Sequence, residues 1–185
     1  MNFLEIIRGE FVLNLFLPNK QVYKPFEIEP KFLQDNNIKG IIVDVDNTLV
    51  PWDVAHATEE VINWLEEMKA ANIKVTIFSN NNKERVTLFA DPLDTPYIYK
   101  ARKPLGHAFE RARKQMELEK WEIAVIGDQL LTDILGGNRA GYYTILVDPL
   151  VTNDAKITTF NRNVERMILN HFYRKGKLKR RVMDQ

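Results

Sequence analysis

The sequence predicts an α/β fold in which helices cover both faces of a mainly parallel, five-stranded sheet. Short apolar segments alternate along the chain with segments whose apolar residues recur at helical spacing, as in proteins built on a parallel sheet. Polar residues directly follow several of the apolar segments, and parallel sheets bind ligands at the carboxyl ends of their strands. At 185 residues, the chain has the length of one domain.

Five segments are predicted to be strands because they are short, apolar and followed by polar or turn-forming residues. The first, at residues 40–46, reads GIIVDVD and ends in two carboxylates. The others are 73–79, 97–99, 122–126 and 144–147.

The segments between and after these strands are predicted to be helices because their apolar residues recur every three or four positions. Thr58 suits an N-cap, Pro104 fits a first helical turn, and Gly141 suits a helix end. The predicted helices are 57–71, a short helix from residue 83, 104–118, 131–140, and an amphipathic helix through 164–172.

The composition excludes several classes of protein. Hydrophobic residues make up 45% and charged residues 28%, which is typical of a globular domain and argues against disorder. The chain has no cysteine, which excludes a disulfide scaffold, thiol catalysis and thiolate metal sites. With three histidines and a net charge of +1, neither a His-rich zinc site nor a nucleic-acid partner is expected.

Two acids at the end of the first strand indicate a metal site. Asp44 and Asp46 are two residues apart, so their side chains can start on the same face of the strand. Their mutual repulsion would be relieved by a hard cation such as Mg²⁺, with Asp128 as a third ligand and Asp133 holding a metal-bound water. Alternatively, the pair only ends the strand, but burying two acids is unfavourable unless something neutralises them.

Four short motifs between residues 40 and 150 resemble, in order and spacing, those of the haloacid dehalogenase (HAD) superfamily of phosphohydrolases. This resemblance implies a HAD-like Rossmannoid three-layer sandwich. The motifs are DVDNT with Asp44, Asp46 and Thr48, TIFSNNN with Ser79, KP with Lys103, and GDQLLTD with Asp128 and Asp133.

The resemblance also implies a role for each catalytic residue. Asp44 would be the nucleophile that forms an aspartyl-phosphate, and Asp46 would be the general acid and base. Thr48 and Ser79 would donate hydrogen bonds to the phosphoryl group, and Lys103 would offset its negative charge.

A Mg²⁺ ion is the implied cofactor. Its ligands would be Asp44, Asp128 and the backbone carbonyl of Asp46, with Asp133 in the outer shell. These positions agree with the acids that the strand pattern places at one edge of the sheet.

Lys100 and Arg102 compete with Lys103 for the role of the third motif's cation. Lys103 is favoured because Pro104, which follows it, is predicted to begin a helix and would fix its orientation.

Three further residues are candidates for binding the substrate. Trp52 and His56 follow the first motif, where the family carries a flap over the site, and Asn80 follows Ser79. For Trp52 and His56 the alternative is that they are ordinary surface residues of the flap.

The spacing of the motifs leaves no room for a cap domain. Residues 49–78 and 80–102 are already used by a predicted helix and strand each. A capless site is open and admits large substrates such as proteins, nucleic-acid ends or lipid headgroups, unless a partner subunit of an oligomer covers it.

Longer segments resemble the YqeG family of subclass IIIA HAD phosphatases, and through it the phosphatidylglycerophosphate phosphatases. These segments are VDVDNTLVPWD, FSNNN, KARKP, GDQLLTDILGGNRAG and the apolar N-terminal stretch ending in LPN. The resemblance implies a Mg²⁺-dependent phosphomonoesterase that converts phosphatidylglycerophosphate to phosphatidylglycerol. The alternatives are another soluble or macromolecular phosphate ester, or a non-catalytic phospho-aspartate signalling module, which Asp46 disfavours because hydrolysis needs its proton transfers.

The whole chain is predicted to be a single HAD-like domain with three parts. Residues 1–39 form an apolar N-terminal extension, 40–150 the catalytic core, and 151–185 a C-terminal helix with a basic tail.

Both ends of the chain are candidates for contact with a membrane surface. Residues 1–17 are apolar but interrupted by charges, with no basic stretch typical of a signal peptide, and 174–181 is basic. The alternatives are packing on the domain for the first segment and a solvated terminus for the second. No segment is long enough to span a bilayer. The expected location is the cytoplasm, with which the absence of cysteine is compatible, with peripheral contact at the inner face of the membrane.

Overall fold

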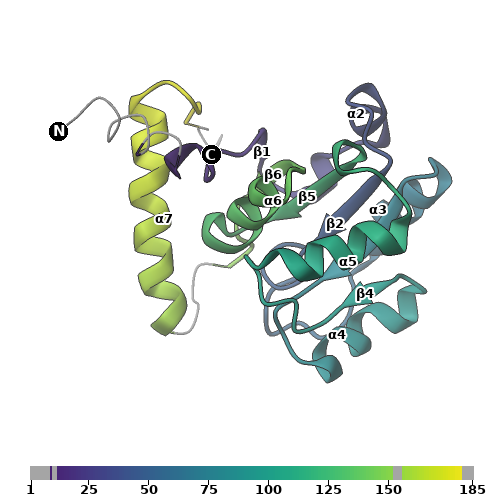
Figure 1. The fold of residues 1–185 in the computed structure, drawn as a ribbon. Coiled ribbons are helices and arrows are strands. Elements are labelled where there is room, and N and C mark those ends of the chain that lie inside the picture. Colours follow the sequence, from purple (N-terminus) through teal and green to yellow (C-terminus); the bar gives the residue numbers. More distant parts are fainter. Residues whose placement is uncertain (1–8, 10–11, 152–155, 181–185) are drawn as a thin grey trace.

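In this computed structural model, six parallel strands form one sheet over the residues that the structure describes, namely 9, 12–151 and 156–180 (Figure 1). Their order across the sheet is β1-β6-β5-β2-β3-β4, and every neighbouring pair is parallel. The strands are β1 (Lys20–Val22), β2 (Gly40–Val43), β3 (Lys74–Phe78), β4 (Tyr97–Ile98), β5 (Ile123–Gly127) and β6 (Tyr143–Val147).

The predicted α/β fold is confirmed, but the predicted count of five strands is too low by one. The additional strand, β1, comes from residues 1–39, the segment predicted to be an extension. It pairs with β6, with Lys20 opposite Ile145 and Val22 opposite Val147. The strand has three residues, of which only Val22 is buried. It therefore shows no alternation of apolar and polar residues by which the sequence could reveal it.

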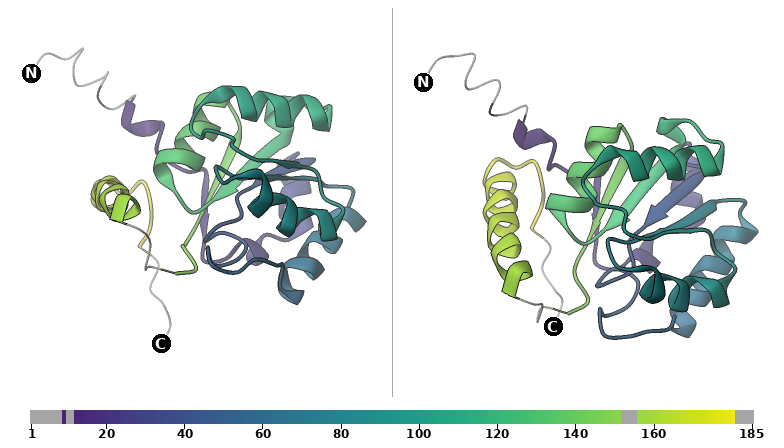
Figure 2. Two further views of the ribbon diagram at one scale, coloured as in Figure 1. Left: turned by 90° about the horizontal axis from the view of Figure 1, so that it is seen from below. Right: turned by 60° about the horizontal axis from the view of Figure 1, so that its bottom comes forward.

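Helices cover both faces of the sheet and give the molecule three layers (Figures 1 and 2). The helices on one face pack on strand residues such as Ile41 and Val43, and those on the other face pack around Ile42. The first face carries α2 (Pro30–Asp35), α3 (Glu59–Ala70) and α4 (Lys83–Ala90), and the second carries α5 (Gly106–Met116) and α6 (Leu135–Ala140).

Two predicted helix boundaries differ from the structure. Pro104 lies before α5, which begins at Gly106, so it does not open the helix. The predicted helix 131–140 consists of a π-helical turn, Leu130–Ile134, followed by α6. Gly141 ends α6 in the left-handed region, with φ 84°, as predicted.

The last helix, α7 (Lys156–Arg174), lies beside the end of the sheet that carries β1 and β6 (Figure 1). Its residues Ile168 and Leu169 pack on a small buried cluster of Leu130, Ile134 and Leu146. This contact brings the helix next to the carboxyl end of β5.

The described part of the N-terminal segment 1–17 contacts the domain. The Asn138 side chain donates hydrogen bonds to the backbone carbonyls of Leu15 and Leu17, at 2.7 and 3.0 Å. Residues 1–8 and 10–11 lie outside the described residues.

The basic tail, 174–181, is described as far as residue 180. Its Lys177 ammonium donates to the Asn14 side chain at 2.8 Å, which joins the two ends of the described chain. None of the described helices combines the length and the apolar character needed to cross a bilayer.

Candidate active site

Polar residues that follow three neighbouring strands lie together at the carboxyl edge of the sheet. Asp44 follows β2, Ser79 follows β3 and Asp128 follows β5. The Asp44 N–H donates to the Ile126 carbonyl at 3.0 Å, so the pairing of β2 with β5 extends one residue beyond β2. The parallel register therefore brings Asp44 next to Asp128.

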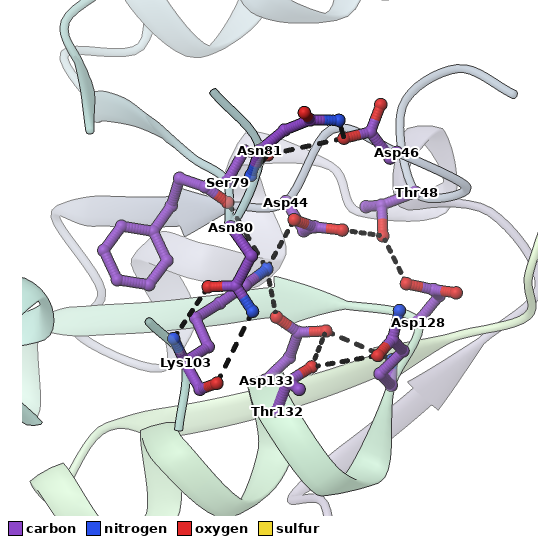
Figure 3. Close-up of polar contacts among 12 residues, drawn as sticks. Asp44, Asp46, Thr48, Ser79, Asn80, Asn81, Lys103, Asp128, Thr132 and Asp133 are labelled. Carbon is purple, nitrogen blue, oxygen red and sulfur yellow. Dashed lines mark hydrogen bonds and ion pairs between the residues drawn. The ribbon is translucent and has the colours of Figure 1, made fainter. Parts of the chain in front are cut away.

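Three buried acids form the centre of this edge (Figure 3). Asp44, Asp128 and Asp133 each offer one carboxylate oxygen, and these oxygens all lie within 4.8 Å of one another. We call these three residues the acid cluster. The Lys103 ammonium contacts Asp44 at 2.5 Å and Asp133 at 2.7 Å.

Burial dominates the electrostatics of the acid cluster. Burial raises the pKa of Asp44 well above its usual range, although Lys103 opposes this effect. Burial likewise raises the pKa of Asp128 to about 6. Burial alone would lower the pKa of Lys103, but Asp133 and Asp44 outweigh it and raise that pKa, so the ammonium stays charged.

Thr48 links two members of the acid cluster. Its hydroxyl lies 3.5 Å from an Asp44 oxygen and 3.3 Å from an Asp128 oxygen, and its side chain is fully buried. A hydroxyl in this position can donate to an anion bound between the two acids.

The Asp46 carboxylate lies outside the acid cluster and faces Asn81 (Figure 3). It accepts hydrogen bonds from Ser79 at 3.3 Å and Asn81 at 3.4 Å, and it forms an ion pair with Arg85 at 2.9 Å. The structure therefore does not bring the Asp44 and Asp46 side chains together around one cation.

Arg85 is a site residue that the sequence did not reveal. Besides Asp46, its guanidinium donates to the backbone carbonyls of Val54 and Ala55, at 2.8 and 3.0 Å. It thus ties the loop after the first motif to α4. Nothing in the local sequence distinguishes it from an ordinary helix-surface arginine.

Asn80 holds the backbone next to Lys103. Its side-chain oxygen accepts from the Lys103 N–H at 2.7 Å, and its amide lies 3.4 Å from the Lys103 carbonyl. The structure thus gives Asn80 a positioning contact, and its predicted role in binding substrate stays a prediction.

The other candidates differ in whether they are exposed or buried with the acid cluster. Trp52 is 53% exposed, and His56 is also exposed. Lys100 is exposed, whereas Lys103 is buried against Asp44. Of the two lysines, Lys103 is therefore the one that reaches the predicted nucleophile.

Helix α7 contributes two charged residues that the sequence analysis missed. Arg162 forms an ion pair with the Asp128 carboxylate and donates to the Asp128 carbonyl at 3.0 Å. Glu165 is buried, accepts from the Leu131 N–H at 3.0 Å, and has its pKa raised to about 7 by burial. The only available signal was the amphipathic pattern of the helix, which does not indicate what its polar side chains contact.

The acid cluster fits a small, hard cation. All its donors are carboxylate oxygens, the ligands that Mg²⁺ prefers in proteins. Among the described residues, Lys103 and Arg162 pair with the three buried acids, and Arg162 also contacts the buried Glu165, so the acids outnumber the cations that contact them. A bound cation would supply the missing positive charge.

The chain is similar to known phosphatases in sequence. A family model described as HAD-hydrolase-like matches residues 100–173. "Probable phosphatase YqeG" of Bacillus subtilis is 60% identical over 161 residues, which cover 87% of this chain and 94% of that protein. "Phosphatidylglycerophosphate phosphatase 1" of Arabidopsis thaliana is 28% identical over 172 residues, which cover 86% of this chain but 49% of that protein.

Solved structures share the fold at low sequence identity. A cobalt-bound deoxy-D-mannose-octulosonate 8-phosphate phosphatase of Haemophilus influenzae is 19% identical, with a TM-score of 0.52 over 73% of this chain and 89% of that one. A protein described as a HAD superfamily (subfamily III A) hydrolase of Legionella pneumophila is 20% identical, with a TM-score of 0.50 over 89% and 91% of the two chains. The four motifs and the parallel sheet agree with the 60% identity to the Bacillus protein, and this identity shows that the chain belongs to the YqeG family of HAD-type phosphatases.

Proposed function

We propose that the protein is a Mg²⁺-dependent phosphomonoesterase that works through an aspartyl-phosphate on Asp44. The observation that carries this proposal is the buried contact of Asp44 with Lys103, next to Asp128, Asp133 and the Thr48 hydroxyl. A buried carboxylate fixed beside cations and hydroxyl donors can attack phosphorus while the developing charge is stabilised.

In the first step, an Asp44 oxygen attacks phosphorus and the bond from phosphorus to the ester oxygen breaks. The leaving oxygen takes a proton from Asp46. Lys103 and the Thr48 and Ser79 hydroxyls donate to the phosphoryl oxygens, which lowers the energy of the transition state. The product of this step is the free alcohol and a phosphorylated Asp44.

In the second step, water attacks the same phosphorus and gives a proton to Asp46. The bond between phosphorus and the Asp44 oxygen breaks, which releases inorganic phosphate and restores the carboxylate. Because the Asp46 carboxylate contacts Arg85 and Ser79 here, it must turn toward the phosphoryl group to perform both proton transfers.

Asp44 and Asp128 are the proposed direct ligands of Mg²⁺, together with the backbone carbonyl of Asp46. Asp133 already accepts from Lys103 and from the Gln129 N–H at 3.2 Å, which supports an outer-shell role. Bound Mg²⁺ would withdraw charge from the phosphoryl oxygens and reduce their repulsion of Asp44.

The proposed substrate is phosphatidylglycerophosphate. The support is the relative in Arabidopsis that carries this activity in its name, and the absence of room for a cap between the motifs. A lipid headgroup at a membrane surface needs an open site of this kind. Residues 1–17 and the basic tail 174–181 are the proposed contacts with an anionic membrane at the cytoplasmic side.

The test is phosphate release from phosphatidylglycerophosphate in mixed micelles, with and without Mg²⁺, beside a panel of soluble phosphate esters. We expect Mg²⁺-dependent turnover that the Asp44→Asn variant lacks, and faster turnover of the lipid than of the panel. If only soluble esters are hydrolysed, the mechanism stands and the lipid is the wrong substrate. Release that Asp44→Asn does not reduce would refute the assigned nucleophile.

A further inference from the structure

A pocket of about 780 Å³ lies outside the acid cluster, against the edge strand β4 and helix α5. Four basic side chains line it, and no acidic residue does. We call it the basic pocket. Its polar lining includes Lys100, Arg102, Arg111, Lys114, Tyr97 and Tyr99.

The charges of the basic pocket are only partly compensated among the residues that the structure describes, since Glu110 interacts electrostatically with Lys114 but forms its ion pair with Arg113. Lys100, Arg102, Arg111 and Lys114 are all exposed and form no ion pair in that part of the chain. By contrast Arg113, on the same helix as Arg111, pairs with Glu110 at 2.8 Å. Four cations gathered in a hollow with few acids nearby produce a positive potential that attracts an anion.

The basic pocket begins on the same loop as the cation of the acid cluster. Exposed Lys100 and Arg102 alternate with buried Ala101 and Lys103, so the loop presents one pair outward and the other inward. Two backbone hydrogen bonds fix this loop to the residues that follow β3. The Ala101 N–H donates to the Ser79 carbonyl at 3.0 Å, and the Lys100 N–H donates to the Asn81 carbonyl at 2.9 Å.

The loop holds its two exposed cations in an unusual backbone conformation. Lys100 has φ 45° and Arg102 has φ 54°, in the left-handed region that non-glycine residues rarely adopt. Such residues persist only where surrounding contacts impose them, and here the two backbone hydrogen bonds do so. The fold therefore fixes the backbone from which both side chains extend.

We propose that the basic pocket binds a second phosphate group, distinct from the one that is hydrolysed. The inference rests on the proposed function in one respect, since it assigns the first phosphate to the acid cluster. Arginine guanidinium groups and lysine ammonium groups are donors that suit phosphate oxygens, and the Tyr99 hydroxyl can add another, whereas Tyr97 already bonds to Asp91. The preferred substrate class is then a phosphomonoester that carries a further phosphate or phosphodiester. Free inorganic phosphate has the same chemistry, and the test below distinguishes the two sources.

The test compares two double variants that each remove two positive charges. Arg111→Ala/Lys114→Ala alters the basic pocket at exposed positions of α5, away from the catalytic loop. Lys120→Ala/Arg139→Ala is the matched control, because it removes one lysine and one arginine at exposed positions outside the basic pocket. Both are made in the Asp44→Asn protein, and binding of fructose 1,6-bisphosphate, fructose 6-phosphate and inorganic phosphate is measured by calorimetry.

We expect the pocket variant to bind the bisphosphate about tenfold more weakly, as loss of charge-assisted hydrogen bonds implies, with binding of the monophosphate unchanged. That result identifies the second phosphate as part of the substrate. If the variant instead loses one of two inorganic phosphate sites and keeps the bisphosphate affinity, the pocket binds free phosphate. Equal effects of both double variants, or no effect of either, would overturn the proposal.

This outcome is independent of the proposed activity because Asp44→Asn does not turn over. If the active protein hydrolysed no phosphate ester, the binding result would still decide the pocket. If hydrolysis were confirmed and the pocket variant bound every probe like the control, only the pocket proposal would fail.

Discussion

At the scale of single residues, Gly127 shows how closely the acid cluster is built. It is the last residue of β5, and its Cα lies against the Asp133 side chain. A Cβ atom at Gly127 would lie 2.3 Å from the Asp133 Cγ, which is far inside van der Waals contact. Only glycine lets the strand pass this close, so it sets where Asp133 meets Lys103.

Gly127→Ala should therefore displace the Asp133 carboxylate. We expect kcat to fall by roughly 10²-fold, as a misplacement of about 1 Å at a catalytic site can cause. Overpacking should also lower the free energy of unfolding by about 1–3 kcal/mol. Steady-state kinetics and urea unfolding measure the two effects. Gly106→Ala is the control because a Cβ there meets nothing within 4 Å, and a wild-type kcat for Gly127→Ala would contradict the argument.

The sequence predicted the residues of the site that lie in motifs and missed those that do not. Asp44 and Asp128 follow buried strands, and an acid at that position is a clear signal. Arg85 and Arg162 lie on helices that carry many charged residues, so only the tertiary packing tells which of those charges faces an acid.

At the scale of elements, helix α7 is the part that sequence reasoning placed least well. Its predicted amphipathic pattern indicates a helix that packs on something, but not where. In the structure it packs on the cluster of Leu130, Ile134 and Leu146, and this places Arg162 at Asp128. Because a guanidinium already pairs with Asp128, a metal ion at that carboxylate must compete with it.

Arg162→Ala should consequently raise the affinity for Mg²⁺ several-fold. Without metal, the same change should lower the free energy of unfolding by about 3 kcal/mol, because it leaves a buried acid without its partner. Calorimetric titration with Mg²⁺ and urea unfolding in a chelator measure these effects. Arg166→Ala, one turn along the helix at an exposed position, should change neither. Weaker Mg²⁺ binding by Arg162→Ala would show that the arginine supports the metal site.

Strand β1 was not predictable for a related reason. Its sequence, KQV, has no apolar alternation, and what makes it a strand is the exposed edge of β6, formed by residues far away in the chain. Strands β2, β3 and β5 were predictable because nearly all their residues are buried on both faces and therefore apolar.

At the scale of the whole molecule, the buried acids should make stability depend on pH. Burial raises the pKa of Asp128 from 3.8 to about 6 and that of Glu165 from 4.5 to about 7. A carboxyl whose pKa is higher in the folded than in the unfolded protein favours folding while it is protonated. That contribution is complete below the unfolded pKa and is lost as the pH rises through the folded pKa.

The free energy of unfolding of the metal-free protein should therefore decline between about pH 4 and pH 7. Added Mg²⁺ should reverse the decline at pH 7, because it binds the ionised acids of the folded state only. Urea unfolding at each pH, with Mg²⁺ or with chelator, measures this. Asp128→Asn should show a shallower decline and a smaller effect of Mg²⁺, and a wild-type response in that variant would count against the assignment.

The two edges of the sheet offer little backbone for pairing with a strand of another chain. The outermost strands, β1 and β4, have three and two residues; Lys20 lies in β1, and Lys100 follows two residues after the end of β4. A strand from another chain would find few free N–H and C=O groups there, and charged side chains beside them. A folding intermediate in which β1 has not yet paired would instead expose the longer edge of β6, so the N-terminal part of the chain also protects the protein against aggregation.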